Sequence, residues 1–188
     1  MNPQFEAAWR LHEELAREGI PYALIGGLAV LKWGEPRLTK DVDATLLVPL
    51  GDEEIVIDRL LASFAPRLPD AREFAIRHRV LLLRAPDLCD LDISFGIPGY
   101  ENEVIDRAVD HDIGGQRSIR ICSAEDLIIH KLVAGRPKDL EDVLGVLYRQ
   151  GPRLDLDRVR VWLARFGELL ERPDLAAEFD RLVENAKT

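Results

Sequence analysis

The stretch from Tyr22 to Leu47 constrains the fold of this chain more strongly than any other. It reads YALIGGLAVLKWGEPRLTKDVDATLL. A short apolar run ending at Ile25 is typical of a buried strand, and two glycines follow it. The segment from Leu28 to Trp33 favours a helix, and a Gly-Glu-Pro sequence ends it. The stretch therefore predicts a strand, a glycine turn, a short helix and a second strand.

Two aspartates, Asp41 and Asp43, flank Val42 where the second strand is expected. Residues two apart in a strand point to the same face, so both carboxylates project together. Like charges on one face repel each other, and a divalent cation relieves that repulsion. Mg²⁺ prefers oxygen ligands and is usually held by one or two carboxylates plus substrate phosphates. The pattern predicts a Mg²⁺ site, with Mn²⁺ as an alternative ion.

The paired glycines Gly26 and Gly27 lie between the expected strand and helix. Without Cβ atoms, their backbone can approach a phosphate closely. The N-terminus of the helix adds free N–H donors and the positive end of the helix dipole. The glycines therefore predict the phosphate-binding half of a nucleotide site.

Together, these features resemble the signature of the DNA polymerase β-like nucleotidyltransferase superfamily. That signature is an apolar strand, Gly-Gly or Gly-Ser, a short helix, and Asp-apolar-Asp/Glu. Within the superfamily, GGLAVLKWGEPRLTKDVD is most similar to the AbiEii-type nucleotidyltransferase toxins. The resemblance implies an α/β (α+β) fold: a small mixed β-sheet flanked by helices, followed by a helical C-terminal lobe. We expect the α/β core to span residues 1–122 and the lobe to span 123–188.

A third carboxylate is expected in the alternating segment DLCDLDISF, where Asp90 and Asp92 share one face. In the resembled superfamily, a carboxylate on a neighbouring strand binds one metal and accepts the proton of the attacking hydroxyl. The similarity of LDISFGIPG to the corresponding family segment favours Asp92, with Asp90 as the alternative. Both could instead be edge-strand charges that discourage aggregation.

The segment HKLVAGRPKDLEDVLGVL resembles the Lys…Ala-x-Arg-x-Lys-Asp-x-x-Asp segment of the AbiEii-type proteins. By that resemblance, Lys131 would reach the nucleotide triphosphate, and Lys138 and Asp139 would shape the site. Arg37 or Lys40 would also neutralise triphosphate charge. From the residues alone, a lysine on an apolar helix face needs a charged partner, which Asp139 could supply. An ion pair joining two helices is therefore the alternative interpretation.

The resemblance implies a metal-dependent transfer of a nucleoside monophosphate from an NTP to an acceptor hydroxyl, with release of pyrophosphate. Asp41 and Asp43 would bind two Mg²⁺ ions, and Asp92 would share one of them. The acceptor would be RNA, such as a tRNA 3′ end, with an antitoxin protein as partner. Two alternatives remain open: a small-molecule acceptor of the aminoglycoside type, and a non-catalytic binding module.

Charge and composition limit the other classes of function. The 188 residues carry a formal net charge of −9, which argues against a general nucleic-acid coat protein. Residues 130–165 nevertheless carry eight Lys/Arg and five Asp/Glu, a net +3, so the rest of the chain carries −12. No apolar run has the length of a membrane span, and the N-terminus is unlike a signal peptide. We expect a cytoplasmic protein that does not enter a membrane.

Overall fold

The computed structural model describes residues 3–96 and 99–187. The chain forms two compact units. The first contains residues 1–28 and 38–122, and the second contains residues 29–37 and 123–188. Each unit is described separately, and the domain boundaries expected from the sequence stay a prediction.

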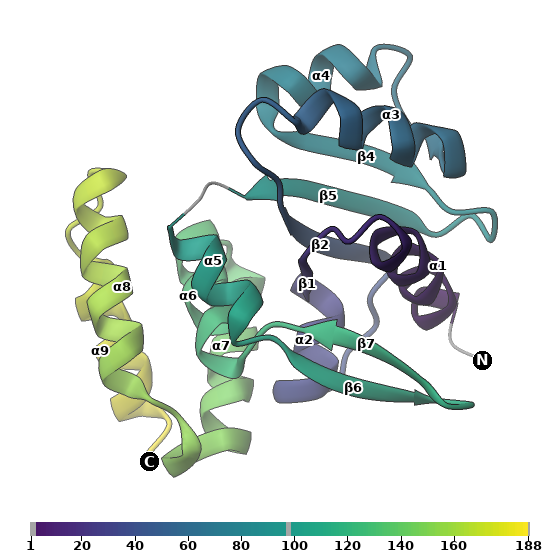
Figure 1. Cartoon of the computed structure of the whole chain (residues 1–188). Helices are drawn as coiled ribbons and strands as arrows, with labels where there is room; N and C mark the ends of the chain where they lie inside the picture. The colour runs from purple at the N-terminus through teal and green to yellow at the C-terminus, as the bar shows by residue number, and fades with distance from the viewer. Residues whose placement is uncertain (1–2, 97–98, 188) are drawn as a thin grey trace. The chain divides into compact units, whose positions relative to one another are not determined.

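The first unit is built on a seven-stranded mixed sheet in the order β3-β4-β5-β2-β1-β7-β6. Neighbouring strands are antiparallel except for the parallel pairs β2–β5 and β1–β7. The predicted mixed sheet is therefore confirmed (Figure 1). The strands are β1 (Tyr22–Ile25), β2 (Asp41–Leu47), β3 (Ala65–Pro66), β4 (Val80–Arg84), β5 (Asp90–Gly96), β6 (Val109–Gly114) and β7 (Arg117–Ile121).

The helices of this unit pack on the apolar side of the sheet. They are α1 (Pro3–Arg17), α3 (Glu53–Ser63), α4 (Ala71–His78) and α5 (Tyr100–Asp106). Burial alternates along the first residues of β2 and β5. Val42 and Leu91 are fully buried, whereas the neighbouring aspartates are only partly buried: Asp41, Asp43 and Asp92. Burial of one face therefore fixes which face carries the carboxylates, because a shift of the strand register by one residue would move the carboxylates to the buried face.

The second unit is helical. It contains most of α2 (Gly26–Trp33), then α6 (Ala124–Ala134), α7 (Pro137–Gln150), a 3₁₀ turn (Gly151–Arg153), α8 (Leu156–Leu169) and α9 (Leu175–Asn185). The end of α2 is joined closely to α7: Gln150 donates a hydrogen bond to the carbonyl of Trp33 at 2.8 Å. A Cβ added at Gly145 would lie 3.0 Å from the backbone nitrogen of Glu35, so the two segments pack backbone to backbone.

Most predicted elements are present. The strand–turn–helix–strand order predicted for the stretch 22–47 is confirmed by β1, α2 and β2. Ser123 is the N-cap of α6, and its side chain accepts a hydrogen bond from the Asp126 backbone N–H. The sequence interpretation missed α4 and the short strand β3. No helix in the described part of the chain is long and apolar enough to cross a membrane.

Candidate active site

Four carboxylates form a two-by-two array on one face of the sheet in the first unit. In the parallel register of β2 and β5, Asp41 pairs with Asp90 and Asp43 pairs with Asp92. Residues that pair directly across neighbouring strands share a face and lie about 5 Å apart. Both candidates for the third carboxylate therefore lie beside the Asp-Val-Asp pair, with Asp92 next to Asp43.

Two arginines contact this array from the β3–β4 side. Arg84 is the cross-strand partner of Asp90, and its Nε donates to Asp90 Oδ1 at 2.7 Å. Arg67 lies 3.5 Å from Asp90 Oδ2 and donates a short hydrogen bond to Asp92 Oδ1. The bond from Arg84, with the nearby charge of Arg67, holds the pKa of Asp90 below its ordinary value. Neither arginine was predicted. Arg84 meets Asp90 through strand pairing, and Arg67, which follows β3, is held beside β4 by a backbone hydrogen bond to Leu82.

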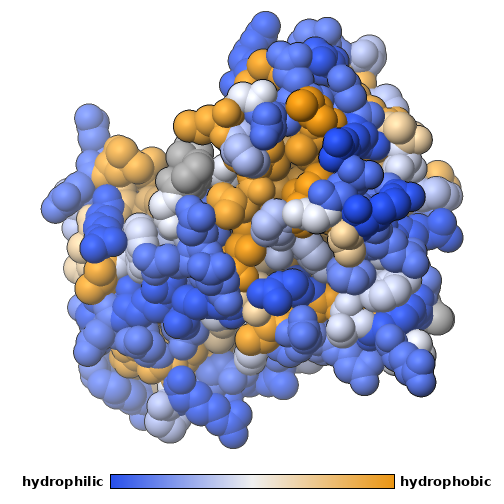
Figure 2. Space-filling model, in the orientation of Figure 1, coloured by the Kyte–Doolittle hydropathy of each residue, from blue (hydrophilic) through white to orange (hydrophobic). Residues whose placement is uncertain are grey.

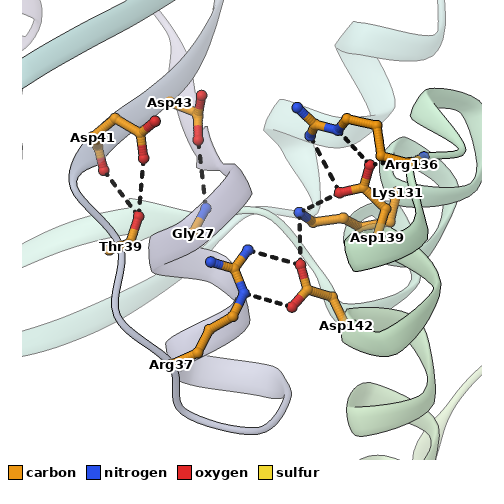
Figure 3. A network of polar contacts seen from close by, with 9 residues as sticks. All are labelled: Gly27, Arg37, Thr39, Asp41, Asp43, Lys131, Arg136, Asp139 and Asp142. Carbon is orange, nitrogen blue, oxygen red and sulfur yellow. Dashed lines mark hydrogen bonds and ion pairs between the residues drawn. The ribbon is translucent and has the colours of Figure 1, made fainter.

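The glycine turn fits closely against Asp43. A Cβ on Gly26 would lie 1.9 Å from Asp43 Oδ2, and Gly26 has a φ of +60°, which favours glycine. The backbone N–H of Gly27 points at the same oxygen at 3.4 Å (Figure 3). These glycines thus place the first turn of α2 against a carboxylate, an arrangement that any side chain at position 26 would displace.

Asp41 is oriented by the residue two positions before it. The hydroxyl of the buried Thr39 donates to Asp41 Oδ1 at 3.0 Å (Figure 3). A Cβ on Gly27 would lie 2.1 Å from that hydroxyl oxygen, so the second glycine is also required by packing. The sequence interpretation assigned no role to Thr39.

The donor chemistry of the array suits a divalent cation. Its groups are carboxylate oxygens, which are hard ligands, and they are partly exposed. In the residues that the structure describes, no group of three His, Cys, Asp or Glu side chains is gathered tightly enough to hold a metal ion. In this structure Asp90 and Asp92 point to arginines, and Asp41 points to Thr39.

A second polar cluster lies within the helical unit. Lys131 Nζ lies 2.9 Å from both Asp139 Oδ1 and Asp142 Oδ2. Arg37 binds Asp142 through two parallel bonds of 2.7 and 2.8 Å, and Arg136 binds Asp139 at 2.6 Å (Figure 3). The predicted pairing of Lys131 with Asp139 is confirmed. The cluster joins α6, α7 and the segment after α2.

The carboxylates of this cluster stay charged despite their burial. Burial alone would raise the pKa of Asp139, but hydrogen bonds from Arg136 and Lys131 lower it overall. Burial likewise opposes ionisation of Asp142, and the bonds from Arg37 and Lys131 bring its pKa below the ordinary value. The sequence interpretation assigned no role in the site to Asp142. Its i, i+3 spacing from Asp139, which places both aspartates on one helix face, is the signal that could have found it.

The remaining predicted site residues, Lys40 and Lys138, are exposed. The structure thus brings the predicted residues together in two separate groups. Asp41, Asp43, Asp92, Gly26 and Gly27 belong to the first unit, and Arg37, Lys131, Lys138 and Asp139 belong to the second.

A pocket of about 570 Å³ lies elsewhere in the first unit. It is lined by Ile20 and Pro21 before β1, by Leu47 and Val48 at the end of β2, and by Val56 of α3, among others. Hydrophobic side chains gather on the surface beside α3 in Figure 2. At about 3.3 Å per residue, β2 separates this pocket from Asp41 by most of its length. The pocket is therefore not part of the carboxylate site.

Solved structures with a similar fold are nucleotidyltransferase-like proteins. An antigenic nucleotidyltransferase-like protein from Paracoccidioides brasiliensis is 20% identical, with a TM-score of 0.55 over 93% of this chain and 91% of that chain. The antibiotic-resistance factor ANT(2″)-Ia, in complex with adenylyl-2″-tobramycin, is 17% identical, with a TM-score of 0.54 over 90% of this chain and 99% of that one. A solution structure of ANT(2″)-Ia gives a TM-score of 0.52 at 18% identity, over 89% of this chain and 95% of that one.

At these identities the likenesses show the fold alone, and they confirm the expected nucleotidyltransferase fold. No curated protein sequence matches the chain. The family is shown by a family model described as "Nucleotidyl transferase AbiEii toxin, Type IV TA system", which matches residues 11–188. The chain therefore belongs to the AbiEii nucleotidyltransferase family, and it is a nucleotidyltransferase.

Proposed function

We propose that this enzyme transfers a nucleoside monophosphate from an NTP to an acceptor hydroxyl, using Asp41, Asp43 and Asp92 as its catalytic carboxylates. The observation that carries the proposal is the register of β2 and β5, which pairs Asp43 with Asp92 on one face. Asp92 is favoured over Asp90 because of their ion pairs. Asp90 forms ion pairs with two arginines, Arg84 and Arg67, whereas the ion pair of Asp92 is with Arg67.

The same three carboxylates would hold Mg²⁺, or Mn²⁺ in its place, because their oxygens match the ligands that these ions prefer. When bound, two such ions would stabilise the negative charge on the attacking and leaving oxygens. Thr39 would keep the Asp41 carboxylate in place, and the N-terminus of α2 would do the same for Asp43.

The chain's own residues would act as follows. Asp92 would accept the proton of the acceptor hydroxyl while the oxygen of that hydroxyl forms a bond to the α-phosphorus. The bond from the α-phosphorus to the bridging oxygen breaks, and the electron pair leaves with pyrophosphate. Backbone N–H groups at Gly26 and Gly27 would bind the β- and γ-phosphates at the N-terminus of α2, and the Gly27 N–H would be shared with Asp43. By the family resemblance, Lys131 and Arg37 or Lys40 would neutralise triphosphate charge, and Lys138 and Asp139 would help to shape the site.

The proposed acceptor is RNA, and the proposed partner is an antitoxin protein. The family description, a toxin of a type IV toxin–antitoxin system, supports the antitoxin partner. The locally basic segment 130–165, with a net charge of +3 on an otherwise acidic chain, is consistent with an RNA acceptor. A small-molecule acceptor remains the second candidate.

The test is transfer of label from each α-³²P nucleoside triphosphate to total cellular RNA in the presence of Mg²⁺. Asp43→Asn keeps the size of the side chain and removes its charge. We expect the rate to fall about 100-fold or more, because several kcal/mol of charge stabilisation are lost. Asp58→Asn is the matched control: Asp58 is an exposed carboxylate of α3 in the same unit, and this variant should retain the rate.

If label enters RNA with the wild-type enzyme and not with Asp43→Asn, the proposal is supported, and the labelled triphosphate that reacts identifies the nucleotide. Transfer at the wild-type rate by Asp43→Asn would remove the catalytic assignment. Absence of label from RNA, with transfer to an aminoglycoside such as tobramycin, would replace the RNA acceptor by a small molecule. Absence of both, with a tight complex with a protein encoded beside it, would favour a non-catalytic module.

A further inference from the structure

The charges around the carboxylate array form two rows across the sheet. One row joins Arg84, Asp90 and Asp41 through the pairing of β4, β5 and β2. The other joins Leu82, Asp92 and Asp43, and Arg67 extends it because its backbone N–H donates to the Leu82 carbonyl at 3.0 Å. Each row therefore has two carboxylates and one arginine at its β3–β4 end.

The two arginines leave the array with a net charge of −2. This is the formal charge of four carboxylates and two guanidinium groups: Arg84 donates to Asp90 and Arg67 donates to Asp92, while Asp41 accepts a hydrogen bond from Thr39 and Asp43, among its contacts, accepts one from Gly27. One divalent cation matches that remaining charge. A second cation that used Asp92 would have to compete with the Arg67 guanidinium for the same carboxylate.

The contact between Arg67 and Asp92 is open to such competition. Arg67 is 24% exposed and Asp92 is 36% exposed, so solvent and ions reach both groups. Arg67 also has a second partner nearby, since its Nε lies 3.5 Å from Asp90 Oδ2. If a cation replaced Arg67 at Asp92, Arg67 could stay paired with Asp90. Both Arg67 and Asp92 would then keep a partner of opposite charge.

We propose that Arg67 is a built-in counter-ion of Asp92, which it holds in the metal-free enzyme and must release, toward Asp90, before Asp92 can bind a cation. The inference rests on the proposed function, in which Asp92 is a metal ligand and the proton acceptor. It assigns Arg67 and Asp90 as positioning residues. While Arg67 is hydrogen-bonded to Asp92 Oδ1, that oxygen is occupied, so the exchange would free it for a cation.

The test is calorimetric titration of the enzyme with Mn²⁺ alone, without nucleotide. In Arg67→Gln the competing charge is gone, and we expect Mn²⁺ to bind about fivefold more tightly, the size of a partly exposed ion pair. Arg84→Gln is the matched control, because it removes the same charge from the neighbouring row without touching Asp92. It should change the affinity by about twofold at most. Arg67→Lys keeps the charge and should restore most of the wild-type affinity.

Equal affinity in wild type and Arg67→Gln would overturn the proposal. An equal increase in Mn²⁺ affinity in Arg67→Gln and Arg84→Gln would also overturn it, because the increase would then come from the loss of any nearby positive charge and not from the Arg67–Asp92 contact. Circular dichroism of each variant confirms that it is folded. The label-transfer assay separates the two hypotheses: transfer by the wild type with no change in Mn²⁺ affinity for Arg67→Gln refutes only the counter-ion. Tightening without any transfer refutes only the proposed reaction.

Discussion

At the scale of single residues, Lys131 shows how the helical unit accommodates a buried charge. Its ammonium group lies between Asp139 and Asp142, and each of these carboxylates has an arginine partner as well. The sequence indicated the need for a partner, because an apolar helix face does not tolerate an isolated charge. It did not indicate that Lys131 would have two carboxylate partners, since that depends on how α6 packs on α7.

Lys131→Met should destabilise the protein by about 3 kcal/mol. The substitution keeps much of the side-chain volume but leaves two buried carboxylates without their common cation, and removing one partner of a buried pair costs about 3–5 kcal/mol. We expect the low end because both arginines remain. The measurement is the free energy of unfolding from urea titration.

Lys138→Met is the control, because Lys138 is exposed on the same pair of helices and should change stability by no more than about 0.5 kcal/mol. If the two variants unfolded at the same urea concentration, the ion-pair cluster would contribute nothing to stability.

At the scale of elements, the glycine turn and the Asp-Val-Asp strand could be predicted because their signals are local. An apolar run, two glycines, a helix-forming segment and an alternating strand follow one another within the stretch 22–47. The pairing of Asp43 with Asp92 could not be predicted, because strand register depends on contacts between distant segments. The helix α4 was missed because its sequence, AREFAIRH, has few apolar residues and no clear stripe.

Gly26→Ala should slow transfer strongly by displacing the Asp43 carboxylate without removing its charge. The added Cβ would lie 1.9 Å from Asp43 Oδ2, so the carboxylate must move. We expect the transfer rate to fall about 100-fold, comparable to the loss of the Asp43 charge.

Gly19→Ala is the matched control for backbone strain. Gly19 has a similar φ of +65°, but among the residues that the structure describes an added Cβ there meets no atom within 4 Å beyond its chain neighbours. In both variants, an alanine in the left-handed conformation lowers the stability of the fold by about 1–2 kcal/mol. A rate loss of the same size in both variants would mean that strain, and not the displaced carboxylate, causes the effect.

At the scale of the whole molecule, the sequence predicted the fold class and the family, and the structure and the family match confirm both. It did not predict that residues 29–37 belong with the C-terminal helices. That grouping depends on close packing of Gly34 and Glu35 against α7 at Val146 and Gly145. The connection from α2 to β2 therefore links the helical unit to the strand that carries Asp41.

The central claim is that three carboxylates of one array, Asp41, Asp43 and Asp92, perform nucleotide transfer. The most direct test is the initial rate of pyrophosphate release, measured with Mg²⁺, the preferred NTP and the acceptor, for Asp92→Asn and Asp90→Asn side by side. Both variants remove one charge from the same strand and face. The account predicts that Asp92→Asn loses about 100-fold or more in rate, while Asp90→Asn stays within about tenfold of wild type. A full rate in Asp92→Asn, or a complete loss confined to Asp90→Asn, would contradict it.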